Sequence, residues 1–323
     1  MQQVPQKRYN TYSAYIKKHF GQRVQKITLD TGFSCPNRDG SKGVGGCTYC
    51  NNNTFNPAYC KPIKSISQQL DEGIAMFSKK YKTQQYLAYF QAYTNTYADI
   101  KLVKKLYLEA LSHPNIKGLV IGTRPDCIST ELADFLEELT KSTYISVEFG
   151  VETTLNRTLL QVNRCHTFEE TIAAYKMMSN RGIHLGAHII LGLPGESKEE
   201  MMEHAAKISA LPIDSLKIHH LQIVKHTMMA FEYRKTPEKF DLFSLEDYLE
   251  FITEFIAVLR PDLVLERFIS ESPKDLLVAP NWGGIKNYAM LDKIDKILLQ
   301  KDYVQGLHYK RTAITSDSSP SLS

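Results

Sequence analysis

Short apolar strands alternate with amphipathic helices along most of this 323-residue chain, and that alternation limits the folds open to it. Strand patterns occupy residues 23–31, 86–93, 118–122, 144–152, 184–191 and 216–224. Helical patterns follow them at residues 65–80, 99–112, 130–140, 167–181, 198–209, 244–259 and 286–301. Strands that alternate with helices form βαβ units around a parallel sheet. The sequence therefore predicts an α/β fold whose parallel sheet is open or closed into a barrel.

Polar residues inside the predicted strands carry information, because parallel strands are usually buried on both faces. Successive side chains of a strand point to opposite faces, and Glu148 and Glu152 lie opposite the apolar face of the fourth strand. The same alternation places His188 opposite the apolar face of the fifth strand. In the sixth strand Lys217 and His219 share a face, but the pattern does not decide which face turns inward. We expect the polar faces to line a lumen, with a site at the carboxyl ends of the strands.

A loop rich in Gly, Asn and Asp follows the first predicted strand and holds three cysteines, Cys35, Cys47 and Cys50. Thiolates at this spacing suit zinc or an iron–sulfur cluster, and three ligands leave one metal position open for chemistry. We favour the cluster, because a structural zinc site needs a fourth ligand and only Cys60 offers one nearby. The aromatic Tyr49 would shield a cluster from solvent. Since the loop follows the carboxyl end of a strand, we expect it to open onto the same lumen.

The length suits one barrel domain with extensions on both sides. The predicted segments are a basic and aromatic N-terminal extension at 1–22, a barrel at 23–225, an α-rich C-terminal extension closing the barrel at 226–312, and a disordered tail at 313–323. The C-terminal extension also contains the pattern of a short seventh strand at 262–268. No apolar run suits a transmembrane helix and the N-terminus has no stretch suited to secretion, so we expect a cytoplasmic protein without membrane contact.

Charge and aromatic content allow a nucleic-acid partner without requiring one. The chain has 39 Lys and Arg against 35 Asp and Glu. Aromatic and basic residues interleave at 7–20, where they could stack bases and contact phosphates. The alternative is a helix that caps the domain, because Tyr9, Tyr12, Ile16 and Phe20 fit one helical face.

Four short motifs extend the pattern beyond the cysteines, at residues 123–126, 148–152, 163–166 and 192–195. Together with the six β/α units they resemble the radical S-adenosylmethionine (SAM) superfamily over most of residues 23–225. That superfamily usually has three residues between its first two cysteines, whereas this chain has eleven. The longer spacing is similar to that of the branch with the elongator complex catalytic subunit, and further details resemble the bacterial YhcC or MnmL family. We expect the elongator subunit's acetyltransferase domain to be absent, because the segment after residue 225 is too short for it.

The resemblance implies a partial (β/α)6 TIM-like barrel of the radical SAM type with N- and C-terminal extensions. It implies a 4Fe–4S cluster on Cys35, Cys47 and Cys50, whose open iron binds the amino and carboxylate groups of SAM. Reductive cleavage of SAM would release a 5'-deoxyadenosyl radical that takes hydrogen from the substrate. The residues implied for cofactor binding are Tyr49, Gln91, Thr94, Glu152 and Arg164. The candidate catalytic residues in the lumen are Glu148, His188, Lys217 and His219.

The substrate expected from the resemblance is tRNA, at the carbon-5 side chain of the wobble uridine. In the MnmL branch the carboxymethylaminomethyl group would be processed toward aminomethyl. The expected partners are tRNA, an external electron donor of the flavodoxin or ferredoxin type, and a methyltransferase acting on the product. Two alternatives stay open: a radical SAM enzyme on a small-molecule substrate, and a non-catalytic RNA-binding module with a structural zinc.

Overall fold

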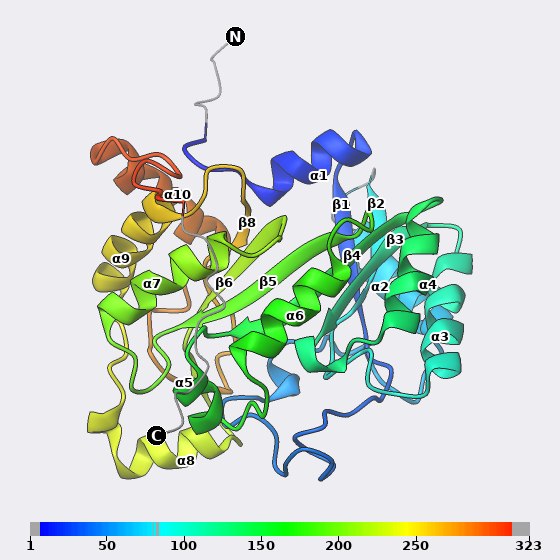
Figure 1. Cartoon of the computed structure of the whole chain (residues 1–323), viewed down its shortest axis with the longest axis horizontal. Helices are drawn as coiled ribbons and strands as arrows, with labels where there is room; N and C mark the ends of the chain where they lie inside the picture. Colours follow the sequence, from blue (N-terminus) through cyan, green and yellow to red (C-terminus); the bar gives the residue numbers. More distant parts are fainter. Residues whose placement is uncertain (1–6, 80, 82–83, 312–323) are drawn as a thin grey trace, which may run out of the picture.

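The computed structural model describes residues 7–79, 81 and 84–311, and its centre is a curled sheet of seven parallel strands (Figure 1). Neighbouring strands follow the order β1-β2-β3-β4-β5-β6-β8. Their bounds are Val24–Leu29 (β1), Gln85–Phe90 (β2), Ile116–Thr123 (β3), Tyr144–Glu152 (β4), His184–Leu191 (β5), Ser215–His220 (β6) and Val264–Arg267 (β8). All six strand pairs are parallel, so the seven carboxyl ends meet at one edge. The predicted α/β partial barrel is confirmed, and the strand expected at 262–268 is its seventh.

Helices cover the outer face of the curled sheet (Figure 1). Further helices precede the first strand and follow the last one. The helix bounds are Tyr12–Phe20 (α1), Ile66–Ser78 (α2), Ile100–Ser112 (α3), Thr130–Thr140 (α4), Asn156–Gln161 (α5), Phe168–Met178 (α6), Lys198–Ser209 (α7), Met228–Lys235 (α8), Leu245–Val258 (α9) and Asn287–Gln300 (α10). Helices α2, α6 and α7 begin with a capping box. In it the N-cap Ser or Thr side chain accepts a hydrogen bond from the backbone N–H of the third helical residue, and the Gln or Glu side chain of that residue accepts one from the N-cap backbone N–H. The starts predicted for these three helices, at residues 65, 167 and 198, lie at most one residue from those observed.

The main hydrophobic core lies between the sheet and its helices. The apolar faces predicted for β4 and β5 point into it, and Val147, Phe149 and Leu185 are almost fully buried. Phe149 meets Tyr175 of α6 edge to face, with ring centroids 5.0 Å apart. Because the apolar face of each strand packs against the outer helices, the opposite face points into the lumen.

The predicted strand at 216–224 is wrong in its second half, because the chain leaves the large sheet after His220. The backbone N–H of Leu221 still bonds to the carbonyl of Leu191 at 2.8 Å. Strand β7 (Ile223–Val224) then pairs antiparallel with β9 (Leu277–Ala279) in a separate two-stranded sheet. Alternation alone could not show this, because both halves are apolar enough to read as one strand.

Helix α1 packs across the amino-terminal ends of the strands, at the end of the barrel opposite the cysteine loop (Figure 1). Tyr15 contacts His184 of β5 with ring centroids 4.8 Å apart, and Phe20 contacts Tyr144 of β4 at 5.3 Å. Thr11 forms a parallel bridge with Leu265 of β8. The capping helix that the sequence allowed is therefore confirmed, and its aromatic rings are used in packing.

Two expectations concern the ends of the chain and the membrane. Residues 1–6 and 312–323 lie outside the described residues, and the predicted disordered tail falls among them. Within the described ranges, every helix is too short or too polar to span a bilayer.

Candidate active site

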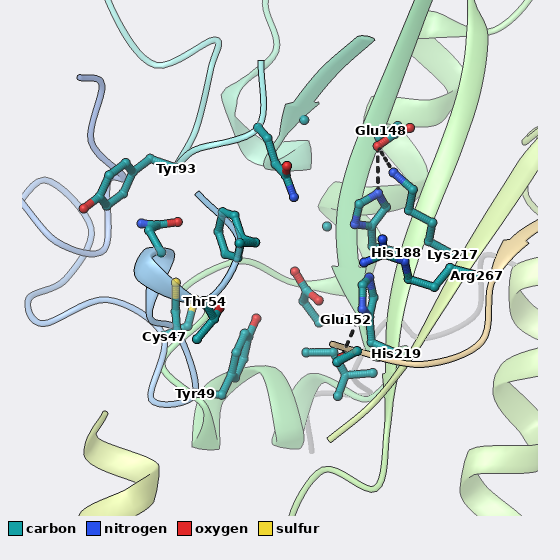
Figure 2. A pocket seen from close by; sticks show the side chains of 18 of the residues that line it. Cys47, Tyr49, Thr54, Tyr93, Glu148, Glu152, His188, Lys217, His219 and Arg267 are labelled. Carbon is teal, nitrogen blue, oxygen red and sulfur yellow. Dashed lines mark hydrogen bonds and ion pairs between the residues drawn. The ribbon is translucent and has the colours of Figure 1, made fainter. Parts of the chain in front are cut away.

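One cavity of about 580 Å³ opens at the carboxyl ends of the strands, and all twelve predicted site residues line it. Figure 2 shows part of this lining. The cysteine loop and all seven strands of the large sheet contribute to its wall. The predicted residues on it are Cys35, Cys47, Tyr49, Cys50, Gln91, Thr94, Glu148, Glu152, Arg164, His188, Lys217 and His219. The structure also settles the sixth strand, because Lys217 and His219 both face the cavity.

The cysteine loop is held in place by the segment that follows α5. Asn163 Nδ2 donates to the carbonyl oxygens of Val44 and Gly46 at 2.9 and 2.8 Å. Asn37 Nδ2 donates back to the carbonyl of Asn163 at 2.7 Å. Gly46 has φ +79°, a conformation in which a side chain is strained, and a Cβ there would also strike Arg38. These bonds hold a loop without regular secondary structure in one shape.

Hydrogen-bond donors point at two of the three sulfurs. Thr94 Oγ1 lies 3.1 Å from Cys35 Sγ, and Cys47 Sγ lies 3.3 Å from Asn37 Nδ2 and 3.6 Å from Arg164 Nη1. Without a bound metal, burial raises the pKa of Cys35, and burial together with Cys47 raises the pKa of Cys50 to about 12.

The donor set fits an iron–sulfur cluster. Clusters are held by thiolates, and hydrogen bonds to their sulfurs tune them. Three cysteine sulfurs lining one cavity, two of them met by N–H or O–H donors, supply that environment. In the part of the chain that the structure describes, no three Cys, His, Asp or Glu side chains are grouped closely enough to hold a single metal ion.

Arg164 joins the cysteine loop to the end of β4. Besides Cys47, its guanidinium donates to the carbonyl of Gly150 at 2.7 Å and lies 3.3 Å from a carboxylate oxygen of Glu152. Its Nε donates to His166 Nε2 at 3.1 Å, and burial together with the Arg164 charge lowers the pKa of His166 to about 3. Glu152 has φ +67°, which is uncommon for a residue with a side chain. The geometry fixes both the cation and the carboxylate at the cavity wall.

Glu148 is the centre of a buried polar cluster on the opposite wall (Figure 2). One of its oxygens lies 2.6 Å from Lys217 Nζ, 3.0 Å from His188 Nε2 and 2.9 Å from the Tyr89 hydroxyl. The other oxygen accepts from Lys26 Nζ at 2.8 Å. Burial opposes the charge on Glu148, but the two lysines outweigh it and hold the pKa of Glu148 well below its usual range. Glu148 is therefore ionised, and His188 Nε2 is the donor in their hydrogen bond.

A second carboxylate balances the second lysine. Glu266 of β8 lies 2.7 Å from Lys26 Nζ and 3.2 Å from Lys217 Nζ. Burial raises the pKa of Glu266, but Lys217 and Lys26 outweigh it and lower that pKa. Burial lowers the pKa of Lys217, only partly offset by the two carboxylates, whereas for Lys26 the carboxylates outweigh burial and raise the pKa. We name these four residues, Lys26, Glu148, Lys217 and Glu266, the lumen charge cluster. Two anions and two cations alternate in it, which is how buried charges are tolerated.

Sequence reasoning missed three residues that the structure adds to this wall. Lys26 lies on the polar face of the first strand, so the alternation of that strand contained its signal. Glu266 and Arg267 are neighbours in β8, yet both line the cavity. Strict alternation would place one of them outside. Only the register of β8 against β6 reveals that both point inward.

Cys60 and Arg124 are both held by contacts that stabilise the fold. Cys60 lies in the hydrophobic core and is not part of the cavity lining, so it is not placed to serve as a fourth ligand. Arg124 is buried and forms a two-pronged ion pair with Asp126 at 2.9 and 3.0 Å. Asp126 also accepts from Lys42 of the cysteine loop at 2.7 Å. That pair fastens the loop to the end of β3.

The curled parallel sheet, the three-cysteine loop and the lumen define a class. The Radical SAM superfamily matches residues 35–208, the Radical_SAM C-terminal domain matches residues 213–300, and this chain belongs to the radical SAM superfamily. It is a radical SAM enzyme, and the cofactors of that class are a 4Fe–4S cluster and SAM.

Within the superfamily the chain is similar to a group of proteins of about its own length. It is 33% identical over 306 residues to YtqA of Bacillus subtilis, covering 95% of this chain and 94% of that protein. It is 35% identical over 278 residues to YhcC of Escherichia coli, covering 86% of this chain and 88% of that protein.

The barrel is also related to tRNA-modifying enzymes. A tRNA uridine(34) acetyltransferase of Methanocaldococcus infernus is 26% identical over 188 residues, 57% of this chain and 33% of that protein. The solved structure of an N-terminally truncated Elp3 from the same organism superposes with a TM-score of 0.64 at 17% identity, over 87% of this chain and 64% of that chain. The chain therefore spans about a third of the acetyltransferase, and it shares the fold of Elp3.

Proposed function

We propose that this enzyme modifies the carbon-5 side chain of the wobble uridine in tRNA and processes a carboxymethylaminomethyl group toward aminomethyl. The observation that carries the proposal is a lumen with a three-cysteine loop on one wall and the lumen charge cluster on the other, in a barrel related to tRNA uridine(34) acetyltransferases. Two walls of different chemistry suit a cofactor on one side and a polar substrate on the other.

The cysteine wall is assigned to the cofactors. Cys35, Cys47 and Cys50 would hold the 4Fe–4S cluster, leaving one iron open to SAM. When bound, the cluster and SAM supply a carbon-centred radical that removes a hydrogen atom from the substrate. The polar side chains assigned to SAM are Tyr49, Gln91, Thr94, Glu152 and Arg164. Tyr49 carries a buried hydroxyl that has no partner among the described residues, as expected of a group that meets a ligand.

The opposite wall is assigned to the substrate. Glu148, ionised and held by two lysines, fixes the position of Lys217 and of His188 Nε2–H. A preformed polar wall orients a bound uridine side chain without having to rearrange, and it replaces water there. We therefore assign Glu148, His188, Lys217 and His219 to binding and orienting the reacting group.

Partners follow from the same assignment. Reduction of the cluster requires an external electron donor, for which a flavodoxin or ferredoxin type is proposed. An aminomethyl product is a nucleophilic amine, so a methyltransferase is the proposed next enzyme. A small-molecule substrate is the second candidate, favoured by a cavity of about 580 Å³, a volume typical of small-ligand sites.

Nucleoside analysis of total tRNA from a strain lacking this protein tests the proposal. We expect carboxymethylaminomethyluridine to accumulate at the wobble position and aminomethyl-derived nucleosides to fall. An unchanged profile, with purified enzyme that still forms 5'-deoxyadenosine from SAM and dithionite, would contradict the tRNA assignment and favour the small-molecule substrate.

A further inference from the structure

A β-bulge turns Arg267 into the cavity. Between β6 and β8, Leu216 pairs with Leu265 and Lys217 pairs with Arg267, so Glu266 is the extra residue. Leu265 is buried in the core, while Glu266 and Arg267 both line the cavity. Bulges next to active sites commonly redirect a side chain in this way. The result is a guanidinium beside the lumen charge cluster that regular pairing would have placed outside.

The side chain of Arg267 has no ion pair or hydrogen bond within the described part of the chain, although the residue is half-buried. Both carboxylates of the lumen charge cluster are already engaged by Lys26 and Lys217. Glu152, across the cavity, is paired with Arg164. A half-buried guanidinium without an anion is costly unless a ligand supplies one. Its planar fork matches a carboxylate in two-pronged geometry.

His219 and Arg267 both line the cavity, and the charge of Arg267 acts on the His219 ring (Figure 2). Its Nδ1 lies 3.2 Å from Ser270 Oγ, and the Ser270 hydroxyl donates its single proton to the carbonyl of His220 at 3.1 Å. Ser270 must therefore accept from His219, so Nδ1 carries the proton and Nε2 is bare. Burial first of all, with His188, Arg267 and Lys217 nearby, holds the pKa of His219 well below its usual value, so the ring is neutral.

We propose that Arg267 and His219 recognise an N-substituted glycine, with Arg267 binding its carboxylate and His219 Nε2 accepting from its amine. This deepens the proposed function and rests on it, because a carboxymethylaminomethyl side chain is an N-substituted glycine. An acceptor and a cation on the wall of the same cavity select both charges of that group at once. Arg267 is then the residue that distinguishes the substrate from its aminomethyl product, which retains the amine but has lost the carboxylate.

Binding of three anticodon stem-loop RNAs to the cluster-loaded enzyme with SAM tests the proposal. The RNAs carry 5-carboxymethylaminomethyluridine, 5-aminomethyluridine or unmodified uridine at the wobble position. The wild type should bind the first about 10- to 100-fold more tightly than the second, the range expected for a charge-assisted, two-pronged contact. Arg267→Gln should bind these two RNAs within about threefold of each other. His219→Phe should weaken both amine-bearing RNAs and leave the unmodified RNA unchanged.

The controls separate the outcomes. Arg234→Gln, an exposed arginine of α8 outside the cavity lining, should keep the wild-type preference. Iron content and SAM binding show whether each variant is loaded, and Arg267→Lys, which keeps the charge, replaces the glutamine variant if that one does not load. If Arg267→Gln still binds the carboxymethylaminomethyl RNA more tightly than the aminomethyl RNA, the carboxylate assignment is wrong. It is also wrong if the variant loses the same affinity for all three RNAs, because Arg267 then contacts a phosphate. Wild-type enzyme that binds the three RNAs equally contradicts the proposed function itself.

Discussion

Arg164 Nη1 lies 3.6 Å from the Sγ of Cys47, so a buried cation faces one of the three cysteines assigned to the cluster. The same guanidinium donates to the carbonyl of Gly150 and pairs with Glu152. One side chain thus couples the cysteine loop to the carboxyl end of β4. This coupling requires the fork of arginine, because an ammonium group cannot satisfy three partners in one plane.

Arg164→Lys should therefore weaken SAM binding by about tenfold or more while the charge is retained. The dissociation constant of SAM for the cluster-loaded protein measures the effect by equilibrium dialysis. Arg157→Lys is a matched control, because Arg157 is more exposed, pairs with Glu200 and does not line the cavity. Equal SAM affinity in the wild type and Arg164→Lys would remove Arg164 from the cofactor site.

Cys47→Ala should abolish the brown colour and most of the iron of anaerobically purified protein, because a thiolate ligand of the cluster is lost. Cys60→Ala should keep both, since Cys60 packs in the hydrophobic core and not on the cavity wall. Iron and acid-labile sulfide per chain are the measurements. A colourless wild type with one zinc per chain would instead support the zinc-binding alternative.

Glu148→Gln should destabilise the fold by about 3–5 kcal/mol, because it leaves two buried lysines facing a single carboxylate. Urea unfolding of the metal-free protein measures the loss. Glu138→Gln, which alters an exposed pair with Lys141, should leave stability unchanged. Adding Lys217→Met to Glu148→Gln should recover part of the stability, since the unpaired cation is removed. A double variant as unstable as the sum of the single variants would show that the two side chains are not coupled.

Because of His220, the free energy of unfolding should fall as the pH drops below about 6.5. Burial lowers the pKa of His220 to about 3, and its Nδ1 accepts from the backbone N–H of Ser270, which a protonated ring could not do. Between these two pKa values the unfolded chain binds a proton that the folded chain does not, so stability falls by about 1.4 kcal/mol per pH unit.

The matching variant is His220→Phe, which keeps a ring against Trp282, where the centroids are 4.0 Å apart. This variant loses the hydrogen bond, but it also has no group that titrates at this position. Its free energy of unfolding should therefore approach that of the wild type as the pH falls from about 6.5 to about 4. Urea unfolding across that range is the measurement. A stability difference independent of pH would show that His220 does not titrate as the burial implies.

Much of the site was accessible from residues alone. Alternation identified the lumenal sides of Glu148 and His188, because a strand buried on one face by helices must direct its other residues inward. The position of the cysteine loop after β1 placed Cys35, Cys47 and Cys50 at the same mouth. The direction of these side chains can be predicted from the sequence because strand side chains alternate with a fixed period.

Features that depend on a neighbouring strand were not accessible in this way. The break after His220 depends on where β7 finds its partner β9, and the sequence there reads as one continuous strand. The sequence left the aromatic residues of α1 open between packing and RNA contact, and only the tertiary structure packs Tyr15 and Phe20 against β5 and β4.

The sequence by itself therefore determined the α/β class, the cysteine loop and the polar faces of the central strands, because these follow from local periodicity and spacing. Only the tertiary structure decided that Glu266 completes the lumen charge cluster. It also decided that Arg267 turns into the cavity, with no side-chain partner among residues 7–79, 81 and 84–311. The physical reason is the bulge against β6, which shifts one residue of register and reverses the direction of the next side chain. Register is a property of two strands, and no single strand contains it.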